Sequence, residues 1–422
     1  MNFNYYYNNN NRYANQNSEL NLELIDIIKA NDCRRLNSKI NEEKNQNLMG
    51  ANFSLDANRR GNQRDEPIEN FRDDTVTLLH IAAFYDSLEC FVYLHKILGL
   101  RLAYESTREY LPLHYACYKG SREIVAYILK EDPGQAALLP KNINHHFLYF
   151  AVYGGDPVIL EELFKHGADL SKPQNKADDP IGKSIDIANI ECLKVLLFHE
   201  KQKQNGNNRT HAMLAALNCH PKALEILINS PEDLSYFSPN DESVMSLMFK
   251  YSNGGIFKDV IIELLTKYPD VRIEPPDDKK MDGVCHWICK MCDPQVAELM
   301  VRTEDVFINR VDSQGHTGPY YLSIRKDSKD EDNQISIEIL KILIGNDFDV
   351  NYRANLKCET ILESFVRAMK VRYKIIEFLL SNGADPHVPT TKNNRITIFQ
   401  EVMSDKVRDD KLKKIFAPYA QT

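Results

Sequence analysis

"LPLHYACYKG", residues 111–120, decides the fold, because two similar decapeptides flank it at a constant distance. "TLLHIAAFYD" covers residues 77–86, and "HFLYFAVYGG" covers residues 146–155. His80 and His114 hold the same position in the first two copies, 34 residues apart, and a leucine follows in the third copy after the same interval. A constant interval of this length indicates one structural unit that is copied along the chain.

Each copy continues into a second apolar run with helical spacing. After residues 111–120, the run is Ile124, Val125, Ile128 and Leu129, which predicts one face of an amphipathic helix. One unit is therefore two helices and a turn. Weaker second helices follow at 191–198, 222–229, 259–267, 295–301, 337–351 and 374–385. Their predicted first helices are 184–188, shortened by about four residues, then 210–218, 243–251, 283–291, 318–326 and 360–368.

The Leu-His-x-Ala frame, with Gly120 six residues after its histidine, resembles the ankyrin repeat. The closing sequences "HGAD" (166–169) and "NGAD" (382–385) resemble the hairpin of that family. Their glycines, Gly167 and Gly383, directly follow a predicted helix, where a left-handed backbone is favourable mainly for glycine. The resemblance implies an all-α ankyrin-repeat solenoid of about ten helix-turn-helix units with short hairpin loops, elongated and curved.

Five segments follow from this organisation. Residues 1–17 are an Asn-rich tail that we expect to be disordered, because such a composition cannot fill a core. Residues 18–42 read as an N-terminal capping helical hairpin, and 43–73 as a flexible insertion without periodicity. The ankyrin-repeat array occupies 74–394, and 395–422 is a C-terminal capping repeat with a short tail.

Two further insertions interrupt the array. The acidic stretch "DSKDEDNQ" (327–334) falls between the two helices of one unit. Between Ser246 and His286 the interval grows to 40 residues, which requires another insertion near "SNGG" or "EPPDDKK". Insertions are expected on exposed loops.

The repeated histidines raise the question of catalysis, because an imidazole in an apolar neighbourhood is unusual. The resemblance implies that the motif His and Thr form hydrogen bonds that fix the first turn of the first helix. Physical chemistry favours the same role, because a buried ring needs a partner and backbone groups at a helix start are unpaired. We therefore expect His80, His114 and His286 to be structural. The motif threonine is absent at Gly283, so the array is diverged.

The sequence "CHWICKMC" (285–292) raises the alternative of a zinc site, because Cys285, His286, Cys289 and Cys292 lie close together. In the repeat frame, however, the three cysteines form the i, i+4, i+7 stripe of a buried helix face. A helix rises about 10 Å over seven residues, which is too far for Cys285 and Cys292 to share one ion. We expect these cysteines to pack as small apolar side chains, with no metal and no other cofactor.

Composition excludes other classes of partner. A net charge of -8 with scattered basic residues argues against nucleic acid. No apolar stretch approaches the roughly 20 residues of a membrane span, and the N-terminus has no secretion signal. Nine cysteines, an odd number, lie mostly within helical patterns, which favours a reducing, intracellular compartment, the cytoplasm. We expect a monomer that binds another protein.

The function predicted from these observations is a noncatalytic interaction scaffold or adaptor. Phosphate-loop, G-x-S-x-G and H-E-x-x-H motifs are missing, and no enzyme is predicted. Two alternatives stay open. One is a substrate-recognition adaptor of a larger enzyme complex such as a ubiquitin ligase. The other is an enzyme with its activity in the diverged central units or the 43–73 insertion.

The resemblance also implies a binding surface on the concave face. In the ankyrin family, contacts come from the hairpin tips and from the two residues before the glycine that ends the first helix. In this chain those positions provide an aromatic series across three units, for which the alternative is simple packing between neighbouring units. The predicted partner-binding residues are Phe84, Tyr85, Tyr118, Lys119 and Tyr153.

Overall fold

The computed structural model divides the chain into two compact units, residues 1–206 and 207–422. It describes residues 18–42, 53–54, 74–138, 146–170, 179–201, 209–252, 255–276, 281–325, 330–353, 358–392, 395–404, 407 and 409–420. The tail 1–17 and most of the insertion 43–73 lie outside these ranges. Within them the protein is all-α, apart from one antiparallel pair of short strands, β1 (Phe53–Ser54) and β2 (Thr75–Val76).

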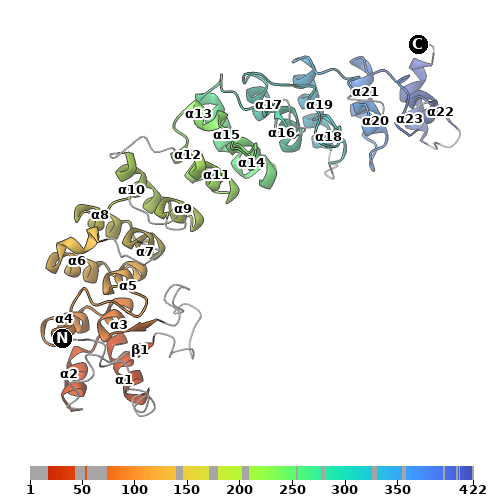
Figure 1. Ribbon diagram of the computed structural model, residues 1–422. Coiled ribbons are helices and arrows are strands. Elements are labelled where there is room, and N and C mark those ends of the chain that lie inside the picture. The colour runs from red at the N-terminus through yellow and green to blue at the C-terminus, as the bar shows by residue number, and fades with distance from the viewer. Residues whose placement is uncertain are drawn as a thin grey trace. The chain divides into compact units, whose positions relative to one another are not determined.

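The first unit consists of helices that pack in two layers (Figure 1). α1, α3, α5, α7 and α9 contact one another in succession and form what we call the first-helix layer, while α2, α4, α6, α8 and α10 form the second-helix layer. The bounds are α1 (Ser18–Lys29), α2 (Cys33–Glu42), α3 (Leu78–Phe84), α4 (Leu88–Lys96), α5 (Pro112–Lys119), α6 (Arg122–Glu131), η5 (Pro133–Ala137), α7 (Phe147–Gly154), α8 (Pro157–Lys165), α9 (Pro180–Asp186) and α10 (Ile190–Lys201).

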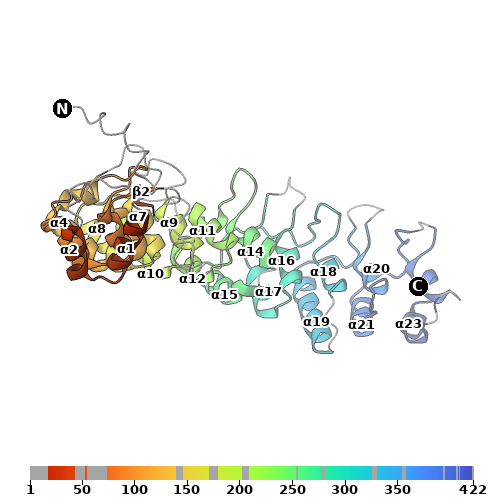
Figure 2. The same cartoon turned by 90° about the horizontal axis from the view of Figure 1, so that it is seen from below.

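The second unit repeats this arrangement, and Figure 2 shows its two rows of helices. α11, α14, α16, α18 and α20 follow one another in one row, and α12, α15, α17, α19, α21 and α23 in the other. The bounds are α11 (Arg209–Leu217), α12 (Pro221–Leu227), α13 (Pro231–Ser235), α14 (Val244–Ser252), η6 (Gly255–Phe257), α15 (Lys258–Lys267), α16 (Val284–Met291), α17 (Pro294–Met300), α18 (Tyr320–Ser323), α19 (Asp330–Ile344), α20 (Ile361–Val366), α21 (Tyr373–Ser381), α22 (Ile398–Met403), α23 (Asp410–Phe416) and η7 (Ala417–Tyr419).

The apolar stripes of both helices in a unit form the core. Ile124, Val125, Ile128 and Leu129 are all buried on α6, in the spacing that the sequence predicts. A polar anchor fixes the hairpin between successive units. The carboxylate of Asp74, which is 1% exposed, accepts hydrogen bonds from Ser106 Oγ (2.6 Å), Thr107 Oγ1 (2.9 Å), Arg108 N (3.0 Å) and Tyr115 Oη (2.5 Å).

Five of the first helices share one backbone signature, in which a left-handed residue lies nine positions after the N-cap. The left-handed residue ends the helix, so that the chain can reverse into the second helix. These N-cap and left-handed residues are Thr77 and Asp86, Leu111 and Gly120, His146 and Gly155, Asp179 and Ala188, and Gly283 and Cys292.

This signature corrects the alignment of the third copy by one residue. The N-cap of α7, His146, follows Leu111 after 35 residues, so Tyr149 takes the histidine position instead of Leu148. The double glycine conceals the shift in the sequence. Gly155 is the left-handed residue (φ 80°), whereas Gly154 is needed for close packing. A Cβ at Gly154 would overlap the carbonyl oxygen of Cys117 and lie 2.8 Å from that of Tyr118.

Two expected boundaries are also wrong, and the expected insertion 43–73 contains one buried strand residue. The first helix expected at 184–188 starts at Pro180, because the Asp179 side chain accepts a hydrogen bond from Ile181 N and proline suits the first helical position. The acidic stretch 327–334 is helical from Asp330, where α19 begins. Within the insertion 43–73, Phe53 is buried and pairs with Val76.

Candidate partner-binding surface

The motif histidines act as acceptors for the first turn of their helices. Nδ1 of His80 lies 3.2 Å from Thr77 N and 2.8 Å from Thr77 Oγ1, and Nε2 donates to the carbonyl oxygen of Tyr110 at 3.0 Å. His286 repeats this pattern, with Gly283 N at 3.1 Å from Nδ1 and the carbonyl oxygen of His316 at 3.1 Å from Nε2. Burial lowers the pKa of His80 to about 4, and lowers the pKa of His286 as well. Both rings are therefore neutral near pH 7.

His114 makes the same first contact, because its Nδ1 accepts from Leu111 N at 2.9 Å. Its ring packs against Phe147, with 4.1 Å between the ring centroids. Complete burial lowers the pKa of His114 well below its ordinary value. In His80 and His286, the carbonyl partner of Nε2 lies thirty residues further along the chain. The corresponding position for His114 is residue 144, which lies outside the described residues.

Other side chains replace histidine at this position in diverged units. Oγ of Ser246 accepts from Ser243 N at 2.8 Å, and Oε1 of Gln400 accepts from Thr397 N at 3.1 Å. The position therefore requires an acceptor for the N-cap amide rather than an imidazole. The three glycines of the predicted motif, Gly120, Gly167 and Gly383, all adopt left-handed backbone conformations.

Glu274 takes the place of the missing threonine at Gly283. Its Oε2 accepts from Val284 N at 2.9 Å and so caps α16 from the inserted loop. Arg310 holds this carboxylate, with 3.1 Å between Nη1 and Oε1, and donates to the carbonyl oxygens of Pro275 (2.8 Å) and Pro276 (2.7 Å). Burial nevertheless raises the pKa of Glu274 to about 7. The sequence predicts an insertion in this region but does not identify Glu274 as the cap, because Glu274 lies ten residues before Val284.

The thiols of 285–292 lie in a packed core. Cys285 and Cys289 are fully buried, and burial raises the pKa of Cys289 well above its ordinary value, which disfavours the thiolate that binds metal. Cys292 is half-buried at the end of α16. Its left-handed backbone takes the place of the glycine found at that position in other units.

One group of possible metal ligands comes together elsewhere in the described part of the chain. Donor atoms of Asp282, His286 and Asp312 lie within 4.8 Å of one another. The two ring nitrogens of His286 are already engaged by backbone groups, as described above. Asp282 contacts the ammonium group of Lys290. Asp312 accepts from Tyr321 Oη at 2.7 Å. Each of the three residues is thus already in contact with other groups of the protein.

The aromatic residues at the ends of the first helices form a series of ring contacts, which we call the aromatic stack, although its second pair is tilted by 35°. In the corrected alignment Phe84, Tyr118 and Tyr153 occupy the same position of α3, α5 and α7. The ring centroids of Phe84 and Tyr118 are 6.1 Å apart, and those of Tyr118 and Tyr153 are 5.1 Å apart. The prediction that Phe84 is available to a partner is wrong, since it is only 1% exposed and packs against Tyr85 and Tyr115.

The remaining predicted binding residues are accessible. Tyr153 is 38% exposed, Lys119 is exposed, and Tyr85 and Tyr118 are half-buried. We call these four residues the aromatic surface. They come from three neighbouring first helices, so the first-helix layer of the first unit brings together all the predicted binding residues except the buried Phe84.

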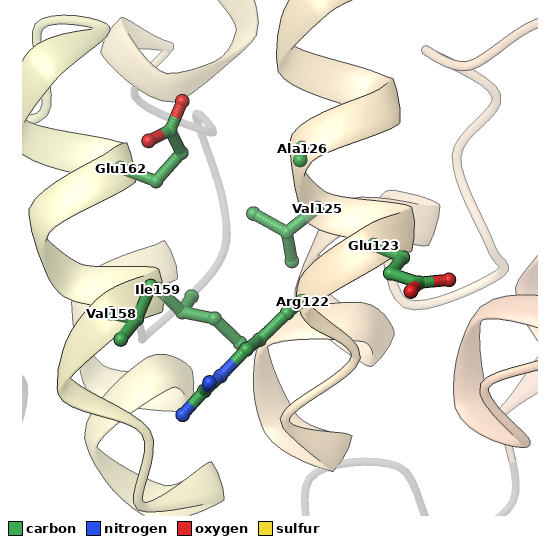
Figure 3. Close-up of a pocket in the computed structure, with 7 residues that line it drawn as sticks. All are labelled: Arg122, Glu123, Val125, Ala126, Val158, Ile159 and Glu162. Atoms are coloured by element: carbon green, nitrogen blue, oxygen red, sulfur yellow. The ribbon is translucent and has the colours of Figure 1, made fainter.

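The opposite layer carries a small depression between α6 and α8 (Figure 3). Val125, Ala126, Val158 and Ile159 provide its apolar lining, and Arg122 reaches across one side to pair with Asp156. Its volume of 210 Å³ is below the range of about 300–1,000 Å³ that is usual for small-molecule sites. This depression is therefore a gap between packed helices and carries no chemistry of its own.

Comparison with known proteins agrees with the repeat geometry. The family model of the ankyrin repeat matches residues 109–142, which include α5 and α6. No curated protein matches the chain. No helix in the described part is both long enough and apolar enough to cross a lipid bilayer. The match covers one repeat, and that repeat carries the helix pair and the left-handed residue that its neighbours share. The chain therefore contains an ankyrin repeat at residues 109–142.

Proposed function

We propose that this chain is a noncatalytic scaffold or adaptor, which binds another protein through the aromatic surface of its first unit. In this proposal residues 74–394 form an ankyrin solenoid of about ten units, closed by the hairpin 18–42 and by the repeat at 395–422. The observation that carries the proposal is the ring contact between Tyr118 and Tyr153 at the ends of α5 and α7, in which Tyr153 is 38% exposed and Tyr118 is half-buried.

Tyrosine in this setting suits a binding anchor. Its ring supplies a large contact area, and stacking on a neighbour restricts its rotation before a partner arrives, so less entropy is lost on binding. The buried ring of Phe84 supports Tyr118 from the other side. The surface thus combines a rigid base with accessible edges.

A noncatalytic role is supported by the chemistry of the reactive groups. Where pKa shifts are resolved for the motif histidines and buried cysteines, burial stabilises their neutral forms, which are weak as acids or nucleophiles near pH 7. The described residues between 180 and 344, where the alternative of a hidden enzyme was placed, form further helices of the same repeated kind. The adaptor alternative differs from this proposal only in the partner.

We further propose that the chain is a cytoplasmic monomer, and its cysteines support the intracellular part of this proposal. All nine are free, and six of them are buried. Free buried cysteine behaves as a small apolar residue and persists most readily in a reducing compartment.

The experiment compares partner capture from an extract of the source cells by the intact chain and by a Tyr118→Ala, Tyr153→Ala variant. We expect the variant to lose its specific partners while its thermal unfolding stays cooperative. Phe198→Ala is the matched control, because Phe198 is an aromatic residue of α10 that is 58% exposed in the second-helix layer. An unchanged set of partners in the double variant, or an equal loss in the control, would overturn the proposal.

A further inference from the structure

Lysine ammonium groups cover the aromatic residues at the ends of the first helices. Nζ of Lys29 lies 4.6 Å from the ring centroid of Tyr85, and Nζ of Lys119 lies 5.1 Å from that of Phe84. At the other end of the stack, Nζ of Lys183 lies 4.9 Å from the ring centroid of Tyr153. The attraction between an ammonium group and a ring face holds each lysine over its ring.

Two lysines of the second unit also lie over aromatic rings, but their charges are paired. Lys250 pairs with Glu242 at 2.8 Å, and Lys290 contacts Asp282, so carboxylates of the same chain neutralise both charges. Lys29 and Lys183 have no carboxylate within 4.0 Å among the described residues. A ring face leaves the outward N–H donors of an ammonium group unsatisfied, and these remain open to an acceptor from another molecule.

We propose that the aromatic surface, together with Lys29 and Lys183, binds an extended acidic segment of a partner protein. This inference rests on the proposed function and names the chemistry of the partner. Carboxylates would accept hydrogen bonds from the lysines, while the peptide backbone and apolar side chains lie along the tyrosine rings. The first 17 residues of this chain contain no aspartate or glutamate, and the first acidic residue is Glu19, so the tail does not provide such a segment.

The spacing of the lysines predicts the spacing of the acidic residues. Lys29 and Lys119 lie over rings of α3, whereas Lys183 lies over a ring of α7, with α5 between them. Packed helices are about 8–10 Å apart, so the two groups are separated by about 16–20 Å. An extended chain advances about 3.3 Å per residue. The acidic side chains of the partner are therefore expected about five or six residues apart.

An acidic protein segment fits better than a nucleic acid. Phosphates follow one another closely along a nucleic-acid backbone and call for clustered lysine and arginine, whereas these lysines are separated by aromatic residues. The net charge of -8 repels a nucleic acid, with a charge at every phosphate, more strongly than a short segment with a few carboxylates. A few lysines on an aromatic base select for a short acidic segment.

The test measures fluorescence anisotropy of a labelled peptide of about twelve residues, in which two glutamate pairs are about six residues apart, mixed with the full chain. We expect a Lys29→Gln, Lys119→Gln, Lys183→Gln variant to bind it at least about tenfold more weakly, and added salt to weaken binding. Lys165→Gln is the control and should bind like the natural chain, because Lys165 is an exposed lysine of α8. Equal binding of a peptide with glutamine in place of glutamate would overturn the inference.

Two further arms separate this inference from the proposed function. A random peptide library is selected on the full chain and on the Tyr118→Ala, Tyr153→Ala variant. Acidic peptides that need both tyrosines support the inference. Neutral or basic peptides that need both tyrosines overturn it but leave the proposed function intact. A single-stranded oligonucleotide that displaces the acidic peptide and binds more tightly would also overturn it.

Discussion

The carboxylate of Glu274 occupies the space that a side chain at Gly283 would fill. A Cβ at Gly283 would overlap Oε1 of Glu274 and lie 2.6 Å from Cδ of Arg310. The inserted loop thus supplies the helix cap that threonine provides in other units, and glycine is required because the cap comes from elsewhere. The glycine at position 283 and the cap from Glu274 therefore depend on each other.

Restoring the family residue at this position should therefore destabilise the protein. We expect Gly283→Thr to lower the free energy of unfolding by about 2–3 kcal/mol, because two buried groups must move. Denaturant titration followed by the fluorescence of Trp287, the single tryptophan, measures this locally, since Trp287 is buried on α16. In a protein that already carries Glu274→Ala, the same substitution should lower the free energy of unfolding by clearly less. A stabilised Gly283→Thr variant would contradict the account.

The pH dependence of the second unit should reflect Glu274. Its pKa rises from an ordinary 4.5 to about 7 on folding, so the native state retains a proton that the unfolded state releases in this interval. Stability then falls as pH rises from 4.5 to 7, by at most about 1.4 kcal/mol per pH unit. The Trp287 transition measured at several pH values should show this slope in the natural chain and lose it in Glu274→Gln. Identical slopes in the two proteins would argue against the buried carboxyl as the cause.

The first unit should respond to pH in the opposite direction. Burial lowers the pKa of His80 from 6.5 to about 4, so the unfolded state binds a proton that the native state excludes. Stability is complete above pH 6.5 and falls as pH decreases toward 4, by up to about 3 kcal/mol. His80→Gln is a matched variant, because Gln400 accepts the N-cap amide in the same position of another unit. Amide exchange in α3, corrected for the intrinsic effect of pH on exchange, reports this stability. Between pH 4 and 7 it should depend less on pH in the variant than in the natural chain.

Close packing of α5 and α7 should depend on Gly154. The Cβ of Gly154→Ala would overlap the carbonyl oxygen of Cys117, and backbone atoms cannot rotate away. We expect a loss of about 3 kcal/mol or more in thermal or denaturant unfolding. Gly134→Ala provides the control in the same unit, since its Cβ would meet only Asp132 Oδ1 at 3.9 Å. Equal stability of the two variants would show that the helices have room to separate.

Much of the repeat could be predicted from local pattern. The histidines at 80, 114 and 286, the left-handed glycines and the apolar stripe of α6 each follow from residues within one unit. The alignment failed at 146–155, because two adjacent glycines fit two registers and only packing against Cys117 distinguishes them. The repeat pattern also could not predict the burial of Phe84, since this burial depends on Tyr115 and Tyr118 from the next unit.

Long-range partners were the least predictable part of the site. The cap from Glu274 and the lysines over Tyr85 and Tyr153 join residues between 10 and 56 positions apart, and no periodicity signals such pairs. The sequence does predict, however, that tyrosines lie at the ends of the first helices, because they recur there in successive units.

The most direct test of the central claim is site-specific photo-crosslinking in the source cells. A benzophenone amino acid replaces Tyr153 in the first-helix layer of one sample and Phe198 in the second-helix layer of another. The account predicts discrete protein adducts from position 153 and few or none from position 198. Adducts from position 198 alone, or the same adducts from both positions, would contradict it.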